Sequence, residues 1–174
     1  MVALTSFFEA IRGFIELGGD VLWAILVVLL MMWTLIIERY WYFFRVLPQR
    51  RREIVNAWRE RSESQSWYAG RIREEMISQL SLEMKRNVPT IQTLIAVCPL
   101  LGLLGTVTGM VAVFDVMAFF GTGNARAMAA GVSQATIPTM AGMVAALSGL
   151  YFGSHLERKS EIESERLEDL LRFE

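Results

Sequence analysis

Three long apolar stretches divide the chain into segments of membrane-spanning length. The first, residues 21–37, reads VLWAILVVLLMMWTLII and contains one polar side chain, Thr34. The second runs from about residue 90 to residue 120 with Asp115 as its only charge, and the third, from about 131 to 153, has none. About 17–25 apolar residues suffice for a helix to cross the ~30 Å hydrocarbon layer. The pattern therefore predicts three transmembrane helices, with the two termini on opposite sides.

Ahead of the first span, apolar residues recur with helical spacing. Glu9, Arg12 and Glu16 lie on the opposite face, and the apolar positions are Leu4, Phe7, Phe8, Ile11, Phe14 and Ile15. We expect this segment to lie along the membrane surface as an interfacial helix; an amphipathic helix packed on the protein itself is the alternative. The charges on both sides of the first span indicate a retained anchor rather than a signal peptide.

Basic residues fall almost entirely on one side of the predicted spans. Eleven Lys and Arg lie between residues 39 and 88 and four follow residue 153, whereas Arg12 and Arg126 are alone on the other side. Loops rich in Lys and Arg stay in the cytoplasm. This distribution predicts an N-terminus outside and a cytoplasmic long loop and C-terminus.

The two cytoplasmic segments show helical patterns. Ile72, Met76, Leu80 and Met84 recur every four residues among charged ones, and the tail carries Leu167, Leu170 and Leu171. The expected fold is thus an all-α membrane protein composed of an interfacial helix (1–18), transmembrane helices (19–44, 89–120, 131–154), a cytoplasmic helical loop (45–88), a short periplasmic loop (121–130) and a cytoplasmic helical tail (155–174).

The basic run Arg50, Arg51 and Arg52 follows the first span by a few residues. A patch of this kind binds either nucleic acid or anionic lipid headgroups. Its position beside a membrane helix favours anionic lipids and argues against nucleic acid.

Composition narrows the chemistry further. Apolar residues of the AVILMFWYC set make up 53% of the 174 residues, and 13 glycines raise this to about 60%, against ~45–50% in soluble domains. The net charge is −1, and Cys98 and His155 are the only residues of their kinds. One cysteine and one histidine exclude a disulfide framework and a Cys/His zinc site within one copy. We expect neither a catalytic site nor a bound cofactor or metal.

Small residues form one stripe on each of spans 2 and 3. They are Gly102, Gly105 and Gly109 on span 2 and Ala135, Gly142, Ala146 and Gly149 on span 3. Stripes of small residues let helix backbones approach closely in lipid. Close helix packing is the expected role of these residues, and Pro99 and Pro138 lie within the same spans.

Thr106 and Thr139 lie within these stripes. Folding the two spans about the loop near residue 123 predicts that both hydroxyls lie at one depth, where they can line a narrow polar passage. The alternative is that each bonds a carbonyl of its own helix. Gln134 adds a polar amide that cannot titrate. Asp115, about 13 Å beyond Thr106, is expected at the outer interface rather than in mid-membrane, so a proton carrier would come from another protein.

The segments PLLGLLGTVTGM (residues 99–110) and GVSQATIPTMAGMVAAL (residues 131–147) resemble the MotA/TolQ/ExbB proton-channel family, most closely its short ExbB-like members of TonB systems, the TtpC type. The resemblance implies a pentamer of three-helix subunits in the bacterial inner membrane. Helices 2 and 3 would line a lumen that holds the transmembrane helices of an ExbD-type partner. The partner would supply a proton-carrying aspartate, and the complex would couple the proton-motive force to a TonB-type protein and so to outer-membrane import.

Carried over to this chain, the resemblance places Thr106 and Thr139 facing the partner aspartate. Gln134 stands where many ExbB and TolQ proteins have a glutamate, which argues against a titrating role at this position and for a polar contact. The cytoplasmic portions are also shorter than in longer family members. A TolQ-like subunit of an envelope motor and a non-conducting membrane scaffold are the alternatives.

Overall fold

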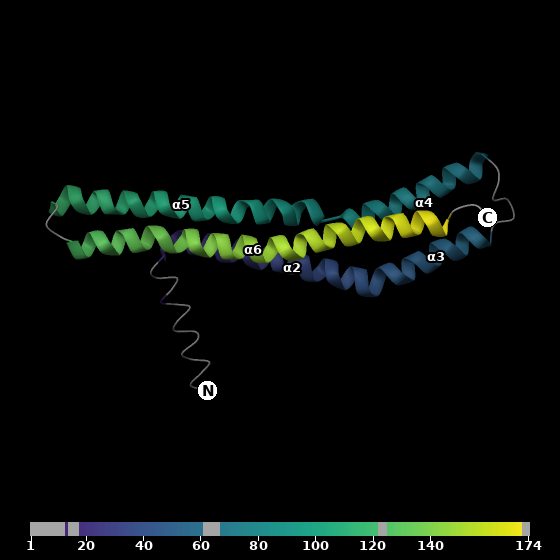
Figure 1. Cartoon of the computed structure of the whole chain (residues 1–174), viewed down its shortest axis with the longest axis horizontal. Helices are drawn as coiled ribbons and strands as arrows, with labels where there is room; N and C mark the ends of the chain where they lie inside the picture. The colour runs from purple at the N-terminus through teal and green to yellow at the C-terminus, as the bar shows by residue number, and fades with distance from the viewer. Residues whose placement is uncertain (1–12, 14–17, 61–66, 122–124, 172–174) are drawn as a thin grey trace, which may run out of the picture. The chain divides into compact units, whose positions relative to one another are not determined.

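The structure is a computed structural model, and it describes residue 13 and residues 18–60, 67–121 and 125–171. Every element among them is helical: α2 (Asp20–Trp41), a short π-helix η1 (Tyr42–Val46), α3 (Leu47–Arg59), α4 (Trp67–Lys85), α5 (Val88–Phe120) and α6 (Ala125–Leu170) (Figure 1). Three helices are long and apolar enough to cross a membrane. The predicted all-α fold with three membrane-length helices is confirmed, and the membrane orientation stays a prediction. The predicted interfacial helix lies almost wholly outside the described residues.

Residues with positive φ separate the helices. Gly19 (φ 72°) precedes α2 and accepts a hydrogen bond from Leu22 N–H, Asn87 (φ 64°) separates α4 from α5, and Gly121 (φ 69°) follows α5. Glycine and, less often, asparagine tolerate this left-handed conformation, which ends a helix. Helix α6 begins at Ala125, inside the stretch expected as a loop, and it continues through Pro138 for 46 residues.

The chain divides into two compact units. Unit 1 comprises Met1–Trp33 and Thr93–Leu150, and unit 2 comprises Thr34–Gln92 and Tyr151–Glu174. In unit 1, α5 and α6 run side by side in opposite directions (Figure 1). Leu22 and Ile25 of α2 form a buried cluster with Cys98 of α5 and Ala145 of α6. The core of this unit is therefore a three-helix contact.

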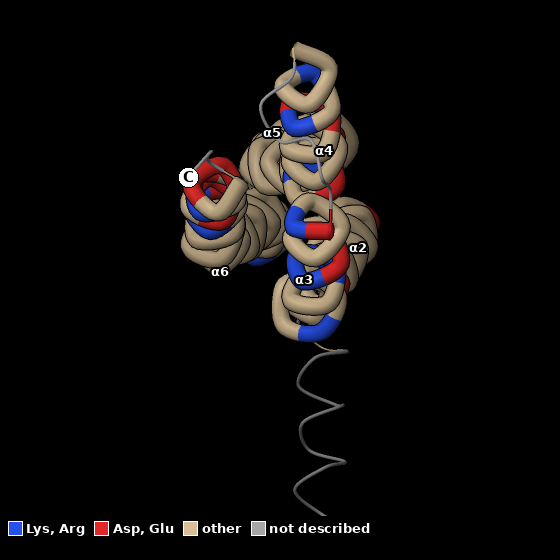
Figure 2. Tube along the Cα trace, turned by 90° about the vertical axis from the view of Figure 1, so that its right-hand side faces the viewer, with Lys and Arg blue, Asp and Glu red and all other residues tan. Residues whose placement is uncertain are grey.

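Unit 2 carries most of the charge. Lys, Arg, Asp and Glu colour α3, α4 and the last part of α6 in Figure 2. The apolar stripe of the expected cytoplasmic loop turns inward at Leu80 and Met84, and Leu167 and Leu171 of the tail are fully buried. Leu170 is half exposed. These segments thus bury their apolar stripes within unit 2 itself.

Arg39, at the end of α2, is a buried cation of unit 2. Its side chain is 3% exposed, and its Nη1 donates to the backbone oxygen of Glu83 at 2.8 Å. Glu83 lies in the last turn of α4, where helix carbonyls have no intrahelical donor. Glu38 pairs with Arg39 Nε at 3.1 Å and also accepts from Asn87 Nδ2 at 3.2 Å. Arg39 therefore caps α4 and fixes the α4–α5 turn against α2.

We expect Arg39→Ala to lower the stability of unit 2 by about 2 kcal/mol, because a buried hydrogen bond from a charged donor is lost and a helix-end carbonyl is left unpaired. Thermal unfolding of the full chain in detergent measures the change. Exposed Arg52→Ala on α3 is the control. If both variants unfold at the wild-type temperature, Arg39 is not the anchor described here.

Candidate functional site

Helices α5 and α6 of unit 1 meet backbone to backbone at three glycines. A Cβ on Gly109 would lie 2.5 Å from Ala135 Cα, and one on Gly142 would lie 2.5 Å from the Cys98 carbonyl oxygen. At Gly102 the added atom would lie 3.0 Å from Thr139 Cα. Main-chain atoms cannot rotate away as a side-chain tip can. These positions therefore set how closely the two helices approach.

The other members of the small stripes meet side chains. A Cβ on Gly105 would clash with the ring of Pro138, and one on Gly149 would clash with the Met32 thioether. The unbranched methionine side chain adapts to such changes more readily than backbone does. Ala135 is buried and Ala146 is half-buried. All seven stripe residues thus lie on half-buried or buried faces, with the contacts to main-chain atoms at Gly102, Gly109 and Gly142.

Thr139 makes a hydrogen bond between the two helices. Its Oγ1 donates to the carbonyl oxygen of Gly102 at 2.9 Å. The absence of a side chain on Gly102 allows this approach, since a Cβ there would lie only 3.1 Å from the Pro138 oxygen. The hydroxyl proton of Thr139 is committed to this bond, so its oxygen can act toward another group only as an acceptor.

Thr106 uses its hydroxyl differently. Its Oγ1 donates to the carbonyl oxygen of Leu103 in its own helix at 2.7 Å, and the residue is half-buried. Thr139 lies against Gly102, whereas Thr106 is four residues, about 6 Å, further along α5. The prediction of one common depth needs this correction, and the two hydroxyls have different partners.

Gln134 lies against the start of α2. Its Nε2 is 2.8 Å from the place where a Cβ on Gly19 would stand, and Gly19 has a φ of 72°. Thr139 faces α5 instead. The structure therefore does not gather Thr106, Thr139 and Gln134 around one point; it places them on different contacts of the same three-helix unit. Asp115 is exposed on α5.

Sequence reasoning missed the Gly19–Gln134 contact and two more hydroxyls. Thr108 Oγ1 donates to Gly105 O at 3.0 Å and Thr136 Oγ1 to Ser133 O at 3.1 Å, each within its own helix. Both residues are exposed. The sequence feature that indicates these hydroxyls is the density of Thr and Ser in spans 2 and 3, which is less conspicuous than the small-residue stripes.

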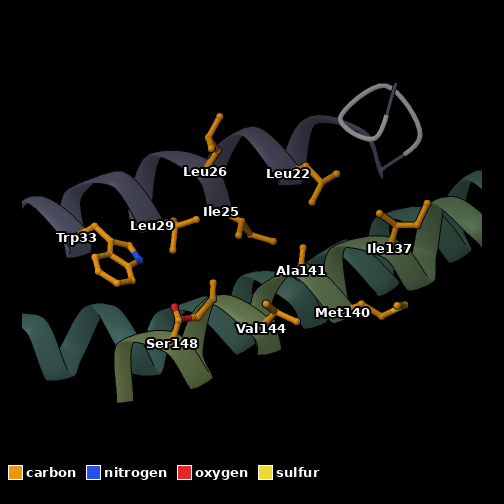
Figure 3. A pocket seen from close by; sticks show the side chains of 11 residues that line it. Leu22, Ile25, Leu26, Leu29, Trp33, Ile137, Met140, Ala141, Val144 and Ser148 are labelled. Carbon is orange, nitrogen blue, oxygen red and sulfur yellow. The ribbon is translucent and has the colours of Figure 1, made fainter. Parts of the chain in front are cut away.

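A cavity of about 600 Å³ lies between α2 and α6 in unit 1. Figure 3 shows Leu22, Ile25 and Leu29 on one side and Met140 and Val144 on the other. The polar atoms labelled at its rim belong to Trp33 and Ser148, and the Ser148 hydroxyl donates to Ala145 O. The lining is suited to an apolar occupant and offers no acid–base chemistry. Among the described residues, no three His, Cys, Asp or Glu side chains gather as metal ligands.

These features define a multi-pass, all-helical membrane protein with a closely packed helix pair. The chain belongs to the MotA/TolQ/ExbB proton channel family, whose model matches residues 47–169, more than half of the chain. The resemblance found in the sequence is thereby confirmed. The family is one of proton channels.

Three curated relatives carry ExbB names. The chain is 43% identical over 70 residues to the biopolymer transport protein ExbB-like 1 of Synechocystis sp., covering 38% of this chain and 28% of that protein. It is 37% identical over 87 residues to ExbB-like 3 of the same organism, covering 48% and 41%. It is 32% identical over 90 residues to the biopolymer transport protein ExbB of Helicobacter pylori, covering 52% and 62%. The matches thus span less than two thirds of each relative, and no solved structure matches significantly.

Gly142→Ala tests the backbone contact. The new methyl group meets the Cys98 carbonyl, and we expect a loss of about 1–3 kcal/mol, the usual cost of overpacking. Gly70→Ala on α4 is the matched control because its Cβ meets nothing within 4 Å, so helix propensity predicts a gain of up to about 1 kcal/mol. Thermal unfolding in detergent ranks the variants. Wild-type stability of Gly142→Ala would contradict the close approach.

Proposed function

We propose that the chain is an ExbB-like subunit of an inner-membrane motor driven by the proton-motive force. With ExbD-type and TonB-type partners, this motor energises TonB-dependent import across the outer membrane. Membership of the proton channel family and the ExbB names of the relatives support this assignment. The observation that carries the structural part is the close α5–α6 pair, in which Thr139 bonds Gly102.

The proposed assembly is a homo-oligomer, a pentamer, with the N-terminus in the periplasm and the C-terminus in the cytoplasm. In the single chain, α5 and α6 leave large apolar side chains uncovered, among them Leu103, Val107, Phe114, Val144 and Leu147. In a membrane such faces meet lipid, neighbouring copies or the transmembrane helices of the partner. The anionic-lipid contact of Arg50–Arg52 belongs to the same proposal.

The proton path is proposed along α5 and α6. No charged residue stands between 88 and 114 or between 127 and 154 in the sequence. The carrier carboxylate therefore belongs to the ExbD-type partner, and this chain supplies hydroxyl and amide groups. Thr106 and Thr139 each have their proton committed to a carbonyl, so both oxygens are available to accept from water or from a protonated carboxyl.

A TolQ-like role is the second candidate, because the matching family includes TolQ. The identity of the partner distinguishes the two: an ExbD- and TonB-type pair encoded beside this chain supports import, and a TolR-type partner supports the envelope motor. A passive scaffold predicts that the threonine hydroxyls are dispensable.

Replacing both threonines tests the path. Each valine removes a hydroxyl oxygen that accepts a hydrogen bond along the proposed path, and losing such a bond costs about 1–3 kcal/mol. We therefore expect the double variant Thr106→Val with Thr139→Val to lower TonB-dependent uptake about tenfold or more. Thr108→Val on the same helix is the control and should keep wild-type uptake. Membrane levels and assembly of each variant are measured in parallel. Normal uptake by the double variant would rule out the hydroxyl path.

Gln134 gives an independent test. Gln134→Glu keeps the length and polarity of the side chain that lies beside Gly19, whereas Gln134→Ala removes the contact. We expect the alanine variant to impair uptake more than the glutamate variant at equal membrane levels. The reverse ranking would contradict the polar-contact account of this position.

A further inference from the structure

A hollow in unit 2 combines an apolar floor with a basic rim. Its volume is about 260 Å³, and the apolar lining comes from Phe43, Phe44, Leu47 and Pro48. Phe43 is 4% exposed and Phe44 is 69% exposed. One aromatic ring is therefore fixed inside the unit, while the next stands free at the edge of the hollow.

The π-helix η1 produces this arrangement. The N–H of Leu47 bonds to Tyr42 O, five residues back, where an α-helix would bond four back. The extra residue in the turn changes the angular positions of the side chains that follow. Single π-turns of this kind occur frequently at functional sites. Here the turn supplies both phenylalanines of the hollow.

The rim is positively charged. Arg51, Lys159 and Arg166 line it together with one carboxylate, Glu163. Glu163 pairs with Arg51 at 3.1 Å and with Arg166 at 2.9 Å. Lys159 Nζ instead lies 4.5 Å from the centre of the Phe44 ring and 5.6 Å from that of Phe43.

A second hollow of about 400 Å³ shares Lys159, Glu163 and Arg166 and adds Arg158 and His155. Across the two hollows, four Lys and Arg side chains face one carboxylate. The residues that line the two hollows therefore carry more positive than negative charge. An oxyanion would complement it, because guanidinium and ammonium groups donate strongly to phosphate oxygens.

We propose that this region binds the phosphate of an anionic membrane phospholipid, with Lys159 as the central phosphate contact. Phe44 lies three residues after the end of α2, and Lys159 lies six residues after the uncharged stretch that ends at Gly153. Both positions correspond to the headgroup level of a spanning helix. The exposed rings of Phe44 and Trp41 offer apolar surface to the acyl chains.

A lipid accounts for the whole site better than a soluble phosphate does. The positive charge alone would suit either ligand, but free phosphate has no apolar part that would contact the four apolar residues beside the cations. The site shares Arg51 with the basic run Arg50–Arg52 and differs from it in being a hollow lined by two chain segments. It depends only on the chain being embedded in a membrane, so failure of the proposed motor function would leave it intact.

Lipid binding to the purified full-length chain in detergent tests the proposal. Native mass spectrometry is used to titrate phosphatidylglycerol, zwitterionic phosphatidylcholine and soluble glycerol 3-phosphate. A basic residue at a membrane surface contributes about a fivefold gain in affinity for anionic lipid. We therefore expect Lys159→Gln to lose about fivefold of the phosphatidylglycerol affinity, whereas Lys85→Gln, an exposed lysine at the end of α4, keeps it.

Glu163→Gln provides a change in the opposite direction, which misfolding cannot imitate. Removing the only carboxylate of the rim frees Arg51 and Arg166, so phosphatidylglycerol should bind more tightly than to the wild type. Four results would overturn the proposal: equal binding of phosphatidylcholine, unchanged affinity in Lys159→Gln, no gain in Glu163→Gln, or glycerol 3-phosphate binding as tightly as the lipid. The last would make the region a soluble phosphate site.

Discussion

The contact of α5 with α6 across Gly102, Gly109 and Gly142 is the constraint on which unit 1 depends. In lipid, apolar side chains gain little by leaving their surroundings, so helices associate through close packing and hydrogen bonds. Glycine permits both here. Because Gly102 has no side chain, the Thr139 hydroxyl lies 2.9 Å from the Gly102 carbonyl oxygen. Because Gly142 has none, the Cys98 carbonyl packs directly against α6. The register of the pair follows from these contacts.

The register in turn decides which groups remain available. The faces that carry glycine and alanine are buried between α5 and α6, so the faces with Leu103, Val107 and Leu147 stay exposed. Thr106 and Thr139 lie at the edge of the contact, with their protons committed to carbonyls. Gln134 is directed to Gly19 at the start of α2. In the proposed function, Thr106 and Thr139 therefore contribute acceptor oxygens rather than charges.

Much of this could be predicted from the sequence because it depends on local pattern. Long uncharged runs indicated the three membrane-length helices, and the spacing of Gly102, Gly105 and Gly109 indicated a packing face. The contacts that depend on two distant segments could not be predicted. Pairing Thr106 with Thr139 requires a turn centred near residue 123, but the observed contacts place Thr139 against Gly102, about one helical turn before Thr106. No local pattern reveals that Arg39 reaches the carbonyl of Glu83, or that a π-turn brings Phe44 to Lys159.

We propose that this chain functions only in several copies around the transmembrane helices of a partner. The mass of the complex purified from membranes together with its ExbD-type partner tests that claim most directly. Native mass spectrometry should show five copies of the 19.7 kDa chain with partner chains retained. A single copy, or a ring that retains no partner chain, would contradict the account.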